Sequence, residues 1–167
     1  MNTLPRCFFI DTCVWLDFFF PTRPGHETAC SLLGLLRSNQ LGIYCSSGVM
    51  QNLSYLAEAL MKRELRARGE EIDDVSGYVT RQFAWSCVQN VRKLAGLVGA
   101  DEQDVWFAEK CHSMHPDFED DLVLAAAKRC EADLLVTNDK ALLAHAVVPA
   151  MSSSDALTLL RELYAGS

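Results

Sequence analysis

The sequence lacks the features that mark several classes of protein. It has 15 Lys and Arg residues against 22 Asp and Glu residues, for a net charge of -7, which argues against a protein that coats nucleic acid by surface charge alone. Its seven Cys residues form no CxxC pair and no zinc-binding spacing. We therefore expect reduced thiols in the core of a cytoplasmic protein. No uncharged apolar run reaches the roughly 18 residues needed to span a membrane.

The apolar run near the N-terminus could be mistaken for a secretion signal. Asp11 and Asp17 interrupt this run, and no small-residue cleavage site follows it. We therefore expect a soluble, cytoplasmic chain with no membrane segment. With 167 residues, half of them hydrophobic, the chain can bury a substantial core, and we predict one domain spanning 1–167.

Short apolar runs alternate with helical patterns along the chain. Strands are predicted at 7–10, 41–45, 133–136 and 147–150. Helices are predicted at 13–20, 26–37, 79–97 and 154–164, with others beginning at Ser46 or Ser47, at Asp101 and at Asp117, and a helical turn at 141–144. The mixed-charge segment 62–77 is expected to be a solvated helix end and a connection. This alternation predicts a three-layer α/β/α sandwich around a mainly parallel sheet.

Three carboxylates occupy comparable places in this pattern. Asp11 follows the first strand, Asp139 follows the strand at 133–136, and Asp120 lies at the start of the helix between them. Ligands of open α/β folds bind beyond the carboxyl ends of the strands, where these residues should meet. Oxygen ligands suit a hard cation such as Mg²⁺ or Mn²⁺. With a bound cation, such a cluster can activate water and stabilise charge during an in-line attack on a phosphodiester.

Each carboxylate also has a purely structural interpretation. Asp117 and Asp120 occupy the N-cap and N3 places of an apolar helix, where acids favour the exposed amides and the helix dipole. Asp139 could cap the turn that follows it. Asp11 has the weakest structural explanation, because a carboxylate directly after an apolar strand has little packing reason to be there.

Three segments together resemble a known family. FFIDT near the start, and DFEDDLVLAAAKR and ADLLVTND near the end, resemble the PIN-domain nucleases, including the VapC-type toxins of bacterial toxin–antitoxin pairs. The resemblance implies a parallel-sheet sandwich whose acidic residues bind Mg²⁺ or Mn²⁺ and cleave single-stranded RNA. It places metal ligands at Asp11, Asp120 and Asp139. The neighbouring residues that would orient these ligands are Thr12, Thr137 and Asn138.

One position departs from the family pattern. Family members commonly carry a Glu early in the helix after the second strand, where this chain has Asn52. Asn offers a metal an oxygen but no charge, so the affinity for a cation should fall. Glu58 is no obvious substitute, because six residues along a helix correspond to about 9 Å. We therefore expect Asn52 to assist catalysis by a hydrogen bond or as a weak ligand.

Other residues have two possible roles. Arg63, Arg66 and Arg68, or Arg81 and Arg92, could contact RNA phosphates or could simply be solvated. His112 and His115 could face the site or end a helix. The aromatic group of Trp15, Phe18, Phe19 and Phe20 fits core packing or a contact with an antitoxin or a second copy.

The sequence thus predicts a metal-dependent endoribonuclease, with an RNA substrate, an antitoxin partner and a homodimeric state. One competing class is a catalytically weakened PIN-like interaction protein that acts by binding a partner. Another is a phosphatase of the haloacid dehalogenase type, which also has an Asp after its first strand. That type requires a further Asp where this chain has Cys13.

Overall fold

A five-stranded parallel sheet forms the centre of the molecule. The computed structural model describes residues 4–112 and 117–164. The strands lie in the order β3-β2-β1-β4-β5 and every neighbouring pair is parallel. Their bounds are β1 Cys7–Ile10, β2 Gly42–Ser46, β3 Gly96–Val98, β4 Leu134–Val136 and β5 Ala150–Met151. Adjacent carboxyl ends therefore lie along one edge, as the sequence predicts.

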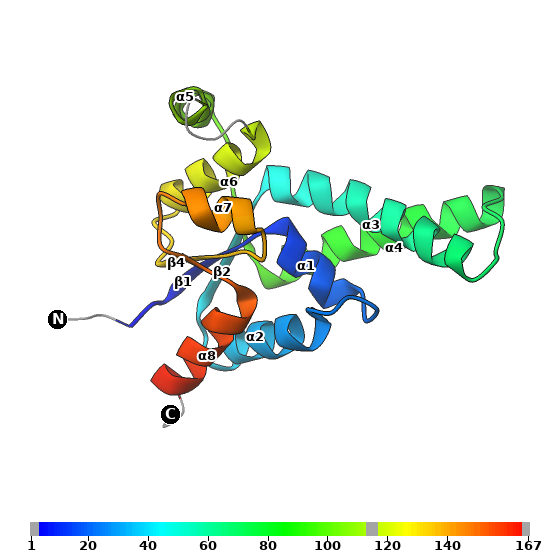
Figure 1. Ribbon diagram of the computed structural model, residues 1–167, viewed down its shortest axis with the longest axis horizontal. Coiled ribbons are helices and arrows are strands. Elements are labelled where there is room, and N and C mark those ends of the chain that lie inside the picture. The colour runs from blue at the N-terminus through cyan, green and yellow to red at the C-terminus, as the bar shows by residue number, and fades with distance from the viewer. Residues whose placement is uncertain (1–3, 113–116, 165–167) are drawn as a thin grey trace.

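Helices connect these strands. Their bounds are α1 Thr12–Phe19, α2 His26–Ser38, α3 Ser47–Ala67, α4 Asp74–Leu94, α5 Glu102–Cys111, α6 Phe118–Arg129, α7 Lys140–His145 and α8 Ser153–Tyr164. Figure 1 shows α2 and α8 together on one side of the sheet, and α5 and α6 on the other. The predicted three-layer sandwich is confirmed. Among the described residues, no helix is long and apolar enough to cross a membrane.

The central strand shows why the sheet lies between two layers of helices. Phe8, Phe9 and Ile10 of β1 are fully buried although their side chains alternate between the two faces. A strand that is apolar on both faces must be covered on both faces, which is typical of parallel sheets. Trp15 and Phe20 are also buried, and Phe18 and Phe19 pack against the same core. This burial favours core packing over an exposed aromatic surface.

The long helical hairpin differs from the prediction. α3 continues to Ala67 and α4 begins at Asp74, so only 68–73 forms the connection, and the pair projects away from the sheet in Figure 1. α4 starts earlier than predicted because Asp73 and Ser76 form a capping box.

The predicted helix at 79–97 is wrong at its end. α4 stops at Leu94, and 96–98 forms the edge strand β3 beside β2. Gly96 permits this pairing, because a Cβ there would lie 2.9 Å from the ring of Tyr44. The last strand is also displaced, from the predicted 147–150 to Ala150–Met151. Short apolar runs do not distinguish a helix end from an edge strand.

The predicted helix caps and the free thiols are confirmed. Ser46 caps α3 by accepting a hydrogen bond from the backbone of Val49, and Asp117 caps α6. All seven Cys residues are free thiols.

Candidate active site

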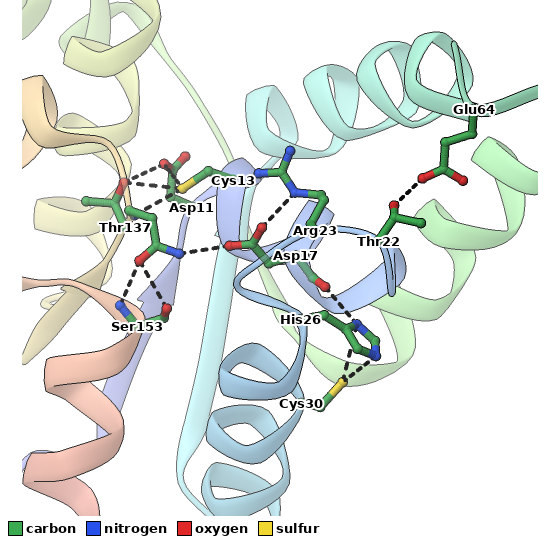
Figure 2. Close-up of polar contacts among 11 residues, drawn as sticks. Asp11, Cys13, Asp17, Thr22, Arg23, His26, Cys30, Glu64, Thr137 and Ser153 are labelled. Carbon is green, nitrogen blue, oxygen red and sulfur yellow. Dashed lines mark hydrogen bonds and ion pairs between the residues drawn. The ribbon is translucent and has the colours of Figure 1, made fainter. Parts of the chain in front are cut away.

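Asp11 lies at the carboxyl end of the central strand and its side chain is buried. The backbone N–H of Thr12 donates to Oδ1 at 2.6 Å, and the Thr137 hydroxyl donates to Oδ2 at 2.7 Å. Figure 2 shows Thr137 reaching Asp11 from the neighbouring loop. Burial is the main cause that raises the pKa of Asp11 above its ordinary value, and the negative charge of Asp139 raises it further. Asp11 and Asp139 are therefore close enough to interact electrostatically.

Asp139 follows β4 and is joined to Asp11 through Thr137. Thr137 Oγ1 accepts a hydrogen bond from the Asp139 backbone N–H at 3.0 Å while donating to Asp11. One carboxylate oxygen of Asp139 accepts hydrogen bonds from the N–H groups of Ala141 and Leu142. Asp139 thus caps α7, which is one of the two roles that the sequence allowed for it. Capping is compatible with binding a cation, since a capping carboxylate remains negatively charged.

Cys13 forms a second link between the ends of β1 and β4. Its thiol donates to Asp11 Oδ2 at 3.1 Å, and its sulfur accepts the backbone N–H of Asn138 at 3.1 Å. Burial and the charge of Asp11 raise the pKa of the Cys13 thiol to about 12. Cys13 is therefore a neutral donor to Asp11. No local pattern indicates the contact between Cys13 and Asn138, because these residues are 125 apart in the chain.

A second buried carboxylate, Asp17 of α1, supports the loop that carries Asp139. Asp17 Oδ1 accepts from Arg23 Nε at 2.6 Å, and Oδ2 accepts from Asn138 Nδ2 at 2.9 Å. Asn138 Oδ1 in turn accepts the N–H and the hydroxyl of Ser153, both at 3.0 Å. A Cβ at Gly25 would collide with the Asp17 carboxylate. Asp17 thus connects α1, the β4 loop and the start of α8.

Asp17 was missed as a site residue, although the sequence contains a signal for it. It is the one charged residue of the helix TCVWLDFF, whose other residues are largely apolar. A charged residue in such a helix must find polar partners if its side chain is buried. Here the partners lie in segments that are distant in sequence.

If the site is the metal-dependent ribonuclease that the sequence predicts, Asp17→Asn should lower RNA cleavage by about 10-fold to 100-fold, the range found when outer partners of metal ligands are removed. Both oxygens of Asp17 accept hydrogen bonds, and Asn has only one acceptor. The amide NH₂ must therefore face either Arg23 or Asn138, both of which donate. The measurement is kcat and KM for a single-stranded RNA substrate, with kcat expected to fall because Asp139 is displaced.

The double variant Asp17→Asn, Asn138→Asp is the matched control. The new carboxylate at position 138 would accept from both the new amide at position 17 and Ser153, which restores the donor–acceptor pairing between these three positions. Recovery of activity in the double variant supports positioning through Asn138. If the double variant is no better than Asp17→Asn alone, this positioning role is contradicted.

The first turn of α6 supplies further carboxylates. Asp117 Oδ1 accepts the N–H groups of Glu119 at 3.0 Å and of Asp120 at 3.3 Å. Asp120 is half-buried in this turn, next to Glu119. At the other end of α6, Arg129 forms ion pairs with Asp101 at 2.6 Å and Asp104 at 2.9 Å. α6 is therefore held at both ends.

Asn52 lies in the second turn of α3 and faces this turn of α6. Its side-chain Nδ2 donates a hydrogen bond to Glu119 Oε1. Partial burial is the largest cause that raises the pKa of Glu119, followed by the charges of Asp117 and Asp11. The sequence prediction included Asn52 but omitted Glu119. Glu58, by contrast, pairs with Lys62 on α3, as expected for an ordinary helix acid.

The predicted basic residues of the hairpin are open to solvent. Arg63 and Arg66 are exposed on the last turns of α3. Arg68, the C-cap of α3, is also exposed and lies 4.0 Å from Glu64. His112 is exposed at the end of α5, whereas His115 lies outside the described residues.

The oxygen-rich set at this edge fits a hard divalent cation. Within 4–112 and 117–164, no Arg, Lys or His forms an ion pair with Asp11, so this buried carboxylate has only neutral donors. In the same residues, the buried hydroxyl oxygen of Thr12 has no hydrogen-bond partner. No three described His, Cys, Asp or Glu side chains are grouped tightly enough to hold an ion by themselves. Like charges repel, so a cation would draw these carboxylates together.

Known structures share this fold at low sequence identity. The VapBC2 complex of Rickettsia felis, bound to a promoter DNA fragment, matches with a TM-score of 0.61 and 13% identity, over 87% of this chain and 97% of that one. VapC20 of Mycobacterium tuberculosis, a toxin that cleaves the sarcin-ricin loop, matches with a TM-score of 0.59 and 14% identity, over 82% and 93%. FitAcB of Neisseria gonorrhoeae matches with a TM-score of 0.57 and 15% identity, over 87% and 97%.

A search of the curated proteins finds no match. The sequence itself matches the model of the PIN domain over residues 8–141. That span begins within β1, ends within α7 and includes all the site carboxylates described above. The match covers most of the chain, and the chain therefore belongs to the PIN-domain family.

Proposed function

We propose that this chain is a metal-dependent endoribonuclease that cleaves single-stranded RNA. The observation that carries the proposal is Asp11, a buried carboxylate at the end of the central strand with neutral donors and no cationic partner among the described residues. Burying a carboxylate in this way is costly unless a positive charge is supplied. A divalent cation from solution supplies that charge.

The residues of the site take separate roles in this proposal. Asp11, Asp120 and Asp139 hold Mg²⁺ or Mn²⁺, and Asn52 assists by a hydrogen bond or as a neutral ligand. When bound, the cation activates water and offsets negative charge at the phosphodiester. Thr137 fixes Oδ2 of Asp11, Thr12 fixes Oδ1, and Asn138 holds the loop that carries Asp139.

The acidic net charge of -7 would repel RNA unless positive charge is available locally. Arg63, Arg66 and Arg68 are the exposed basic group on the α3 end of the projecting hairpin. We assign them phosphate contacts, which position RNA without reading its sequence.

The solved structures of similar fold support a proposal about partners. VapC20 is a toxin, and VapBC2 is bound to a DNA fragment from its own promoter. We propose that this chain is likewise a toxin, with a cognate antitoxin in the cytoplasm and a homodimeric state.

A second candidate is a PIN-like interaction protein that no longer cleaves. Asn52 favours this candidate, because it removes one negative charge expected at the site. The two functions differ in metal binding. Titration calorimetry with Mn²⁺ should give saturable binding for the nuclease, and binding to a partner without Mn²⁺ uptake would support the interaction protein.

The test of the nuclease is cleavage of an end-labelled single-stranded RNA of mixed sequence by the purified chain. Internal cuts are expected with Mn²⁺ or Mg²⁺, and EDTA should stop them because the carboxylates alone cannot activate water. RNA that stays intact at high enzyme concentration with both metals would overturn the proposal.

A further inference from the structure

The amide of Asn52 is bonded to a carboxylate that comes from another helix. Asn52 is the α3 position where the family resemblance leads one to expect a Glu. Its Nδ2 donates to Glu119 Oε1, which belongs to α6 and lies 67 residues away in the chain. The negative charge therefore sits one hydrogen bond away from the side chain that lacks it.

The surroundings of Glu119 place this charge toward the site. Its backbone N–H is fixed by Asp117, its neighbour is Asp120, and it lies within electrostatic range of Asp11. An exposed carboxylate with no attractive partner turns away from like charges, because water relieves the repulsion. The hydrogen bond from Asn52 instead holds Glu119 beside α3.

The residue at position 52 must be a donor for this arrangement to exist. Two ionised carboxylates in hydrogen-bond contact would repel, whereas an amide facing a carboxylate attracts. Asn52 and Glu119 therefore act as a pair. The pair has one carboxylate, and it is that of Glu119.

We propose that Glu119 is a ligand or close electrostatic partner of the divalent cation and replaces the carboxylate absent at Asn52. This inference rests on the proposed metal-dependent function. With Glu119 included, the site has four carboxylates, from Asp11, Glu119, Asp120 and Asp139, so Asn52 does not leave it short of negative charge.

The experiment is titration calorimetry of Mn²⁺ into five purified full-length proteins: the wild type, Asp11→Asn, Glu119→Gln, Asn52→Asp with Glu119→Gln, and Glu162→Gln. Glu119→Gln should weaken Mn²⁺ binding by at least about tenfold, because metal affinity depends on ligand charge. In the double variant the new amide at position 119 can donate to the new carboxylate at position 52, which reverses the hydrogen bond and restores the charge at nearly the same place. Its affinity should return to within about threefold of the wild-type value.

Glu162 is an exposed residue of α8 that forms no part of the proposed site, and Glu162→Gln should bind Mn²⁺ as the wild type does. The Mn²⁺-induced rise in melting temperature provides a second readout that needs no RNA. If Glu119→Gln binds Mn²⁺ normally while Asp11→Asn does not, the role of Glu119 is overturned and the nuclease proposal stands. If the wild type binds no Mn²⁺, both proposals are overturned. Failure of the double variant to recover would refute the exchange of charge between the two positions.

Discussion

Replacing Asp11 with Asn is expected to reduce RNA cleavage by at least about 100-fold, the upper end of the effect seen when a partner of a metal site is lost. Asn keeps the size of the side chain but removes its charge. Its oxygen can still accept from Thr12, and its NH₂ can donate to the Thr137 hydroxyl. The fold should therefore survive while the cation is lost. The measurement is the single-turnover rate at saturating Mn²⁺.

Asp74→Asn is the matched control for this substitution. Asp74 is an exposed residue in the first turn of α4, and the same change of charge there should leave the cleavage rate within about twofold of the wild-type rate. An Asp11→Asn protein that cleaves as fast as the control would show that Asp11 is not part of the active site.

The second large effect is on stability and depends on pH and on the cation. Burial raises the pKa of Asp11 above its ordinary value of 3.8, so the folded chain keeps this proton to a higher pH than the unfolded chain does. Asp139 raises this pKa in the same direction, and the pKa of the nearby Glu119 is raised as well. As pH rises from the ordinary value through the raised one, the free energy of unfolding falls, and the loss persists at neutral pH. The Asp11→Asn protein does not lose this stability, because the amide at position 11 does not ionise.

Without a divalent cation at pH 7, Asp11→Asn should therefore be more stable than the wild type. Mn²⁺ at 100 times its Kd should stabilise the wild type by about 2.7 kcal/mol and leave the variant nearly unchanged. Urea unfolding with EDTA or Mn²⁺, at several pH values from acid to neutral, measures both effects. Equal stabilisation of the two proteins by Mn²⁺ would place the cation elsewhere.

The site residues at the carboxyl ends of the strands were predictable, because local sequence patterns determine where the strands end. A short apolar run before Asp11 and another before Asp139 indicate two buried strands, and parallel strands end at one edge. The cap at Asp117 and the start of α6 follow from an acidic turn before an apolar helix. These features need only a few neighbouring residues.

The supporting contacts were not predictable because they join distant segments. Asp17 and Asn138 are 121 residues apart, and Asn52 and Glu119 are 67 apart. Each pair depends on how two helices or loops pack, which no local pattern records. The edge strand β3 was missed for a similar reason, since its pairing with β2 is decided by the lack of a side chain at Gly96.

The chemistry of the ends of the RNA products tests the central claim most directly. Attack by water in line at the phosphorus, with the cation and Asp11 in place, should leave a 5′-phosphate on one product and a free 3′-hydroxyl on the other, and EDTA should abolish both products. End-specific ligation and phosphatase treatment of the products distinguish these ends. Products with 2′,3′-cyclic phosphates that form equally well in EDTA would contradict metal-dependent hydrolysis by this site.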